Sequence, residues 1–272
     1  MSKMFLTAAA VAVSIPLLVT GAEAADIIDI QESMPVEERM APEWTFSIDP
    51  FYGWLPGFDG DMLVFGHKAS IDITAWDLIQ NLDELIHALN GIYEGSGELR
   101  NHQFGFQYDI VYLNLGGTKN FGGDILSGSA DLGFKMSMTT LAGNYRFYET
   151  PTAYADIFAG ARITDVSVDL DLEVGNAGFE ASDGDTWVDP VIGVKGRYDL
   201  NQNWYVKGTA LYGGFGVSSD CLYDVAGFLG YEWANGIELY GGWRVAYTDY
   251  ENDGFEWDMQ LSGPMFGLTF KF

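Results

Sequence analysis

The sequence predicts an all-β protein, an up-and-down antiparallel β-barrel of about ten strands that spans a membrane. Three observations predict this fold class. The N-terminus has the pattern of an export signal, and most of the remaining chain is a series of segments with a two-residue hydrophobic period. The third observation is the composition, because 48% of the 272 residues are hydrophobic, 15% are aromatic, only 19% are charged, and 34 are glycine.

Charge and cysteine content exclude several classes of protein. The chain has 13 Lys and Arg residues against 39 Asp and Glu residues, a net charge of −26. Nucleic acid is not an expected partner, because its recognition requires a basic surface. A disordered acidic coil would lack aromatic residues. The single cysteine, Cys221, excludes a disulfide framework and a zinc site built from several cysteines.

The first segment of the chain is the export signal. Lys3 is followed by an apolar run and by a small-x-small site that ends at Ala24, so we expect a signal peptide over residues 1–24. A membrane anchor is disfavoured because the apolar run is shorter than the ~20 residues of a spanning helix. Residues 25–43 are acidic and show no sustained period, which predicts a flexible periplasmic tail. The barrel is expected over residues 44–272.

From Trp44 onward, apolar residues alternate with polar ones, as in a half-buried strand. Most of the alternating segments are long enough for the roughly 9–11 residues that a tilted membrane-spanning strand requires. After the segment that begins at Trp44, similar segments occur at about 86–95, 102–115, 132–148, 153–173, 179–200, 203–215, 221–233, 237–249 and 256–272.

The connections alternate in length, which is typical of barrels in bacterial outer membranes. Short turn signals occur at 95–98, 149–152, 201–202 and 234–236, and longer links at 56–85, 116–131, 174–178, 216–220 and 250–255. Both termini then fall on the short-turn side, the periplasm. Eight or twelve strands stay open as alternatives to ten, because residues 62–65 and 69–73 could form a further hairpin.

Charged residues within these strands should point into the barrel. A Lys or Arg side chain in lipid costs about 2–4 kcal/mol at mid-depth. A small barrel fills its lumen with side chains, so we expect charge pairs as filling rather than as the selective lining of a channel. The residues expected in these lumen pairs are Arg146, Asp156, Arg162, Asp189, Lys195, Arg197, Glu238 and Arg244.

Two strands change the parity of their apolar residues. One change falls at 162–165 and the other at 262–264, and at both places we expect a β-bulge. In the first long link, Thr74 precedes an apolar stripe with Asp77 at the capping-box position, which predicts one short extracellular helix. This helix could plug the barrel mouth or lie on the rim as a lid. A membrane-surface helix is disfavoured, because its polar face has no Lys or Arg.

The C-terminus resembles the assembly signal of bacterial outer-membrane proteins, which the barrel assembly machinery recognises. The residues that carry this resemblance are Phe266, Leu268, Phe270 and Phe272. Further segments, at 52–57, 188–193, 213–217 and 241–244, resemble a broad family of small bacterial outer-membrane barrels of mostly unassigned function. The resemblance covers about residues 44–272 and implies the architecture rather than an activity. In members of this family a Trp often follows a Ser-Asp pair. This chain differs, because the residue after Ser219 and Asp220 is Cys221.

The sequence gives weak signals for a metal or a catalytic site. The acidic loops, which include Asp59, Asp61, Asp183 and Asp185, could bind divalent cations, but their spacing completes no EF-hand loop, and a solvated acidic rim is favoured. The histidines are His67, His87 and His102, and no motif places a serine and a carboxylate beside those near the outer mouth. We therefore expect no cofactor, no defined metal site and no enzymatic activity.

Together these patterns predict a monomer in the bacterial outer membrane, in contact with outer-membrane lipid and with the assembly machinery during biogenesis. A structural or narrow-pore role with a largely filled lumen is the main functional expectation. One alternative is a surface-binding or adhesion barrel that acts through its acidic loops. The other is a barrel enzyme that acts on lipid or peptide with a rim histidine.

Overall fold

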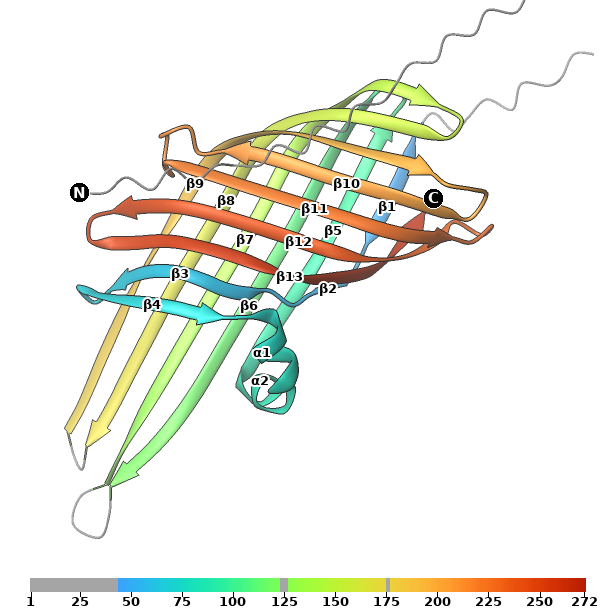
Figure 1. Ribbon diagram of the computed structural model, residues 1–272. Helices are drawn as coiled ribbons and strands as arrows, with labels where there is room; N and C mark the ends of the chain where they lie inside the picture. Colours follow the sequence, from blue (N-terminus) through green and yellow to red (C-terminus); the bar gives the residue numbers. More distant parts are fainter. Residues whose placement is uncertain (1–43, 123–126, 175–176) are drawn as a thin grey trace, which may run out of the picture. The chain divides into compact units, whose positions relative to one another are not determined.

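The computed structural model describes residues 44–122, 127–174 and 177–272 (Figure 1). The predicted signal peptide and the acidic tail lie outside the described residues. Within these ranges, no helix is long and apolar enough to cross a membrane. The elements are β1 (Thr45–Asp49), β2 (Tyr52–Trp54), β3 (Gly57–Val64), β4 (His67–Ile73), α1 (Ala75–Gln80), α2 (Leu82–Ala88), β5 (Leu89–Asn101), β6 (Phe104–Gly122), β7 (Ser127–Thr150), β8 (Ala153–Val174), β9 (Ala177–Asp199), β10 (Trp204–Gly213), β11 (Cys221–Glu232), β12 (Ile237–Asn252) and β13 (Phe255–Lys271).

The strands form a closed antiparallel barrel. Each strand from β5 to β13 pairs with the next one along the chain, and β1 pairs with both β5 and β13. Ser47 of β1, for example, lies opposite Glu98 on one side and Lys271 on the other. Since β1, β2 and β3 follow one another along β13, they act as one interrupted strand, and the wall has ten strands. The predicted fold class and strand number are confirmed.

Beyond the end of β1, the neighbouring strands β4 and β5 are not hydrogen-bonded to each other. β4 pairs only with β3, and the part of β5 before Gly95 pairs only with β6, so a seam separates β4 from β5. Beyond the end of the β1–β5 pairing, the Glu94 carboxylate accepts the backbone N–H of Trp54 of β2 at 2.6 Å. This contact satisfies a buried backbone donor that the ladder leaves unpaired. The predicted hairpin at 62–73 therefore exists, but its second strand lies outside the closed wall.

Two short helices lie at this seam. Thr74 caps α1 as predicted, because its hydroxyl accepts the N–H of Asp77 and its own N–H donates to the Asp77 carboxylate. α1 contacts β3 and β13, and α2 contacts β5 and β6. In the described part of the chain, neither helix contributes to the hydrophobic core or lines the lumen cavity, so the plug alternative is wrong. The pair instead flanks the seam, with Trp76 and Ile86 exposed.

The inward faces of β8 and β13 stay the same from end to end. In β8, Asp156, Arg162 and Val166 are all buried, and the pairing with β9 runs without a register shift. β13 is likewise continuous against β12 and β3. Both predicted bulges are therefore wrong. The apolar parity changes because the outer face passes from lipid into water, while the strand itself keeps its pleat.

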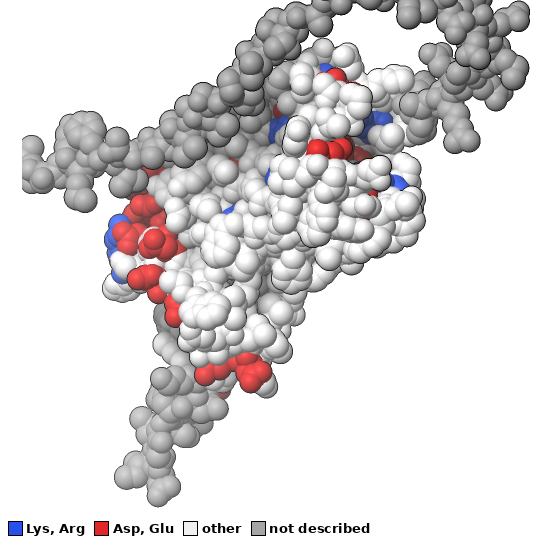
Figure 2. Space-filling view, turned by 45° about the vertical axis from the view of Figure 1, so that its right-hand side comes forward, with Lys and Arg blue, Asp and Glu red and all other residues white. Residues whose placement is uncertain are grey.

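The change in polarity along the outer face divides the barrel into two parts. In the membrane-spanning part, the outward side chains are apolar, with aromatic residues near the short turns; these are Trp44, Phe104, Tyr145, Tyr198, Trp204 and Trp233. Figure 2 shows a wall that is mostly free of charged side chains, with acidic residues gathered at its margins. The second part, which we call the extension, reaches beyond the membrane, and β6 to β9 project furthest from it (Figure 1).

The extension has a hydrophobic core inside it. Trp187 of β9 stacks on Tyr250 of β12 with ring centroids 4.0 Å apart, and Trp257 of β13 stacks on Phe134 of β7. Further fully buried side chains of this core come from several strands, and they are Val111, Met136, Val166 and Met259. The lumen is therefore filled with apolar side chains at this level.

Candidate functional site

The membrane-spanning part of the lumen contains a cavity of about 560 Å³. Its lining gathers most of the positive charge of an acidic chain, since it includes eight of the 13 Lys and Arg residues and five carboxylates. The cations are Arg100, Arg146, Arg162, Lys195, Arg197, Lys207, Arg244 and Lys271, and the carboxylates are Asp49, Glu98, Asp109, Asp224 and Glu238. The predicted filling is therefore incomplete on the periplasmic side.

Strand register brings the charges near the short turns into contact. Asp156 of β8 lies opposite Arg146 of β7 and opposite Lys195 of β9, all on the inward face. Arg146 Nε lies 2.9 Å from Asp156 Oδ1, and Arg100 Nη2 reaches the other carboxylate oxygen at 2.5 Å. Lys195 pairs with Glu98. This cluster joins β5, β7, β8 and β9 across the lumen.

A second cluster continues from β9 towards β13. Arg197 of β9 donates to Glu238 of β12, and to Glu232 of β11 at 2.5 Å. Lys271 of β13 also pairs with Glu238, at 2.5 Å, and Tyr205 donates its hydroxyl to the same carboxylate at 3.0 Å. Charge-assisted bonds of this kind compensate the desolvation of the carboxylate.

A buried layer ends the cavity on the extracellular side. Arg244 of β12 lies 2.8 Å from both Asp224 of β11 and Asp109 of β6. Arg162 of β8 binds Asp224 at 2.7 Å, and Tyr52 of β2 donates its hydroxyl to Asp109 at 2.8 Å. We call these five residues the sealing layer. The hydrophobic core of the extension lies beyond this layer.

Seven of the eight predicted lumen residues lie in these three clusters. The exception is Asp189, which is fully buried and pairs with no cation among the described residues. Its carboxylate instead accepts the N–H of Ser219 at 2.8 Å and the Ser219 hydroxyl at 2.6 Å, and so anchors the turn before β11. Asp109 and Asp224 were not predicted, although the same rule that strand charges point inward applies to both.

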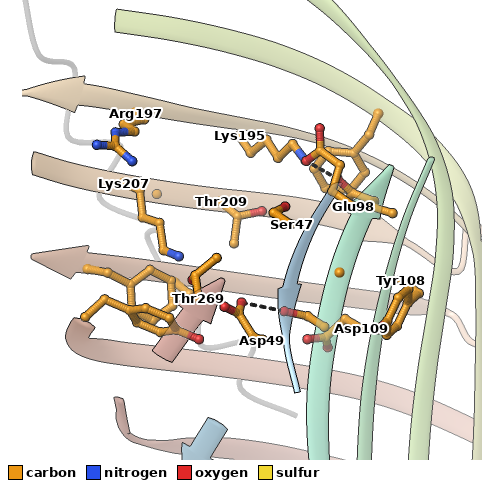
Figure 3. A pocket seen from close by; sticks show the side chains of 18 of the residues that line it. Ser47, Asp49, Glu98, Tyr108, Asp109, Lys195, Arg197, Lys207, Thr209 and Thr269 are labelled. Carbon is orange, nitrogen blue, oxygen red and sulfur yellow. Dashed lines mark hydrogen bonds and ion pairs between the residues drawn. The ribbon is translucent and has the colours of Figure 1, made fainter. Parts of the chain in front are cut away.

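Lys207 of β10 differs from the other cations of the cavity. The other seven each form an ion pair, whereas no carboxylate of the described residues lies within 4.0 Å of Lys207. Its ammonium lies 3.8 Å from the centroid of the Tyr240 ring and 5.5 Å from that of Phe228. Figure 3 shows this side chain reaching into the cavity beside Thr269 and Asp49.

At the outer end of the extension, an acidic triplet connects distant strands. Asp183 of β9 accepts the N–H of Phe65, in the turn between β3 and β4, at 2.5 Å. Asp185 accepts the Tyr250 hydroxyl at 2.7 Å and the Asn252 amide at 2.9 Å. Burial acts to raise the pKa of Asp185, but these hydrogen bonds outweigh it and lower the pKa below its usual value. Burial and the bond to Asp185 raise the pKa of Tyr250 to about 12.

The arrangement of these acidic residues does not resemble a metal centre. Among the described residues, no group of three or more His, Cys, Asp or Glu side chains could hold an ion. In the acidic segment with Asp59 and Asp61, Asp61 accepts the Ser70 hydroxyl at 2.6 Å and pairs with Lys68 at 3.1 Å. Binding of divalent cations by the acidic loops stays a prediction.

Comparison with solved structures decides the class of the fold. The chain is similar to the outer-membrane protease OmpT from Escherichia coli, with a TM-score of 0.51 and 16% identity over 84% of this chain and 96% of that one. The translocator domain of the autotransporter NalP from Neisseria meningitidis matches with a TM-score of 0.41 and 10% identity, over 86% and 90% of the two chains. Ail, the attachment invasion locus protein of Yersinia pestis, matches with a TM-score of 0.31 and 12% identity, over 84% and 97%. No family model and no curated protein sequence matches the chain.

The chain has the fold of a bacterial outer-membrane β-barrel. The predicted localisation and the resemblance drawn from the sequence are confirmed at the level of the fold. The C-terminal assembly signal stays a prediction. Phe266 and Leu268 point outward from β13 as the signal requires, and the Phe272 ring stacks on Phe46 with centroids 6.3 Å apart.

The same comparison corrects the expectation that the chain is not an enzyme, because the first of these similar barrels is a protease. That expectation depended on the lack of a linear motif near His67 and His87. In a barrel, however, catalytic side chains can come from strands far apart in sequence, so motif spacing does not exclude catalysis. At 16% identity the likeness shows the fold alone and assigns no catalytic residue here. The His87 ring lies 2.6 Å from the backbone oxygen of Asp83, and His102 occupies the turn between β5 and β6.

Proposed function

We propose that this outer-membrane barrel conducts no solutes and that it holds the extension rigidly above the membrane as a binding surface. One observation carries this proposal: strands such as β8 and β13 pass from the membrane into the extension without a register shift. A continuous hydrogen-bonded ladder makes the extension one rigid body with the membrane anchor.

Two barriers in series support the absence of conduction. Four of the five residues of the sealing layer are buried, with Arg162 only 1% and Arg244 only 5% exposed, and Asp109 is partly buried. Beyond it, an ion would have to enter an apolar core that contains Trp187 and Trp257. Moving an unpaired charge into such surroundings is strongly unfavourable.

The dimensions of the strands support a role for the extension. β7, β8 and β9 have 24, 22 and 23 residues, whereas a membrane crossing takes about 9–11. The outward side chains of the upper part of β8 include Asp165, Asp169 and Asp171, and among the side chains that the structure describes only Asp169 pairs with a cation, Lys135, at 2.9 Å. An acidic and rigid face of this kind suits a cationic partner. It favours the surface-binding role over a pore.

Planar-bilayer recording tests the absence of conduction. The mature protein should give no stable current steps, whereas a general porin inserted into the same bilayer should conduct. Steady steps from the wild-type protein would contradict the proposal. An Arg162→Ala/Arg244→Ala variant should remain silent if the apolar core is a second barrier.

Site-directed labelling tests whether the extension is at the cell surface. With Cys221 replaced by serine, Asp171→Cys should react on intact cells with a maleimide that cannot cross membranes. Asn235→Cys, in the short turn between β11 and β12, is the matched control and should react only after the outer membrane is permeabilised. The reverse pattern would show that the extension faces the periplasm.

A further inference from the structure

We propose that the lumen cavity is a binding site for a small carboxylate that carries a hydrogen-bond donor on the adjacent carbon, as in α-amino and α-hydroxy acids. This inference goes beyond the proposed surface role. It begins with polar groups of the cavity that the protein leaves unmatched.

The first of these groups is the Lys207 ammonium. Among the described residues it has no carboxylate within ion-pair distance, and its nearest electron-rich neighbour is the Tyr240 ring. A cation in a largely enclosed site favours an anion as its partner, because charge-assisted hydrogen bonds are stronger there than in water. Lys207 therefore provides the contact for a carboxylate.

The second and third groups are oxygens. Asp49 Oδ1 and Thr269 Oγ1 are buried and have no hydrogen-bond partner within residues 44–122, 127–174 and 177–272, whereas the other Asp49 oxygen accepts the Ser96 hydroxyl at 2.8 Å. Lys207, Asp49 and Thr269 all point into the same part of the cavity (Figure 3). An unmatched carboxylate oxygen requires a donor. The ligand therefore needs an ammonium or hydroxyl group as well as its own carboxylate.

The ligand must offer a carboxylate to Lys207 and a hydrogen-bond donor to Asp49, and these two requirements exclude several classes of ligand. Inorganic phosphate or a simple carboxylate could pair with Lys207, but it would bring a second negative charge close to Asp49. An amine could pair with Asp49, but Lys207 would repel it. An α-amino or α-hydroxy acid satisfies both groups with adjacent atoms.

The remaining lining accepts an apolar side chain. Phe158, Leu211, Phe228 and Met265 contribute to the cavity beside the charged groups. The volume of about 560 Å³ lies within the range of roughly 300–1,000 Å³ for small-molecule sites. Since the sealing layer closes the extracellular side, and Lys271 and Phe272 at the chain end also line the cavity, entry is from the periplasm.

Four probes that share a phenyl ring test the ligand class by calorimetry on the refolded full-length mature protein in micelles. L-phenylalanine and L-3-phenyllactate have both groups, 3-phenylpropionate has only the carboxylate, and phenethylamine has only the amine. We expect the first two to bind at least tenfold more tightly than the others. Empty micelles correct for partition of the ring into detergent.

Two variants test the residues. Lys207→Met should weaken binding of phenylalanine at least tenfold, and Lys207→Arg should restore most of it. Asp49→Asn should reduce the preference for phenylalanine over 3-phenylpropionate. Lys135→Met, on the outer face of the extension, is the matched control and should bind as the wild type does. Circular dichroism and heat-modifiable mobility check that each variant is folded.

Equal affinity for the four probes, no binding of any probe, or unchanged binding by folded Lys207→Met would each overturn this inference. Its failure can be distinguished from that of the proposed function. A conducting barrel that binds phenylalanine would overturn the surface proposal alone. A silent barrel that binds none of the probes would overturn the cavity site alone.

Discussion

The membrane-spanning part of the barrel and its extension are built from the same strands but have opposite polarity. Below the sealing layer, charged side chains such as Asp156 face the lumen and apolar ones such as Ile157 face outward. Above it, Val166 faces inward and Asp165 faces outward on the same strand. The pleat fixes which residues share a face, while the medium outside fixes which face is apolar.

The two parts are therefore stabilised by different interactions. Water drives the extension to bury Trp257 and Met259, so its core follows the rules of a soluble β-barrel. In the membrane-spanning part, lipid surrounds the outer wall, and cross-lumen ion pairs such as Arg244 with Asp109 connect the strands inside. Substitutions at adjacent positions should consequently have opposite effects in the two parts.

The largest effect is expected from a charge inside the extension. Val166→Lys would bury an ammonium without a partner in the apolar core and should destabilise the barrel by about 5 kcal/mol or more. Ser167→Lys, one residue along and on the outer face, should change the free energy of unfolding by less than about 0.5 kcal/mol. Urea unfolding in micelles, followed by tryptophan fluorescence, measures both. Similar costs for the two variants would break the proposed inversion of polarity.

The next largest effect is expected from an apolar side chain in the sealing layer. Arg244→Leu would leave Asp109 without its cation and Asp224 with Arg162 alone. Removing one partner from such a network should cost about 3–5 kcal/mol. The same unfolding measurement checks this value. Lys68→Met, which breaks an exposed pair with Asp61 in the extension, is the control and should cost at most about 1 kcal/mol.

A smaller effect is expected on the lipid-facing wall. Val194 of β9 is 51% exposed and points outward within the apolar belt. Val194→Lys should cost about 2–4 kcal/mol in a bilayer, because the ammonium would face hydrocarbon. Ser182→Lys lies further along the same outward face, above the membrane, and should be nearly neutral. If Val194→Lys leaves the free energy of unfolding unchanged, position 194 lies outside the hydrocarbon region of the membrane.

The sequence allowed much of this fold to be predicted because strand periodicity and turn length are local properties. It predicted ten strands, the capped helix after Thr74 and the inward charges Arg146 and Arg244. The sequence-based prediction was wrong where the pattern depends on the surroundings of the strand rather than on the local sequence. The supposed bulges at 162–165 and 262–264 are changes of surrounding medium, which alternation alone does not distinguish from a change of register.

The candidate site was predicted less completely for a related reason. The sequence identifies charged residues on inward faces, but which of them meet depends on register across the barrel. Arg244 reaches Asp109 on a strand 135 positions away in the chain. Asp189 was assigned to a lumen pair, although its partner is Ser219. That Lys207 lacks a carboxylate partner follows only from the three-dimensional placement of every nearby acid.

The smallest expected effect concerns the outer end of the extension, where Asp185 accepts bonds from Tyr250 and Asn252. Because these bonds lower the pKa of Asp185, its contribution to stability is present above the unfolded value, near ~3.9. This contribution is lost as the pH falls through the lower, folded value. Asp185→Asn should therefore show a shallower decline of unfolding free energy below about pH 4 than the wild type. Since every other charge is the same in both proteins, parallel pH profiles would show that Asp185 does not contribute to the acid sensitivity.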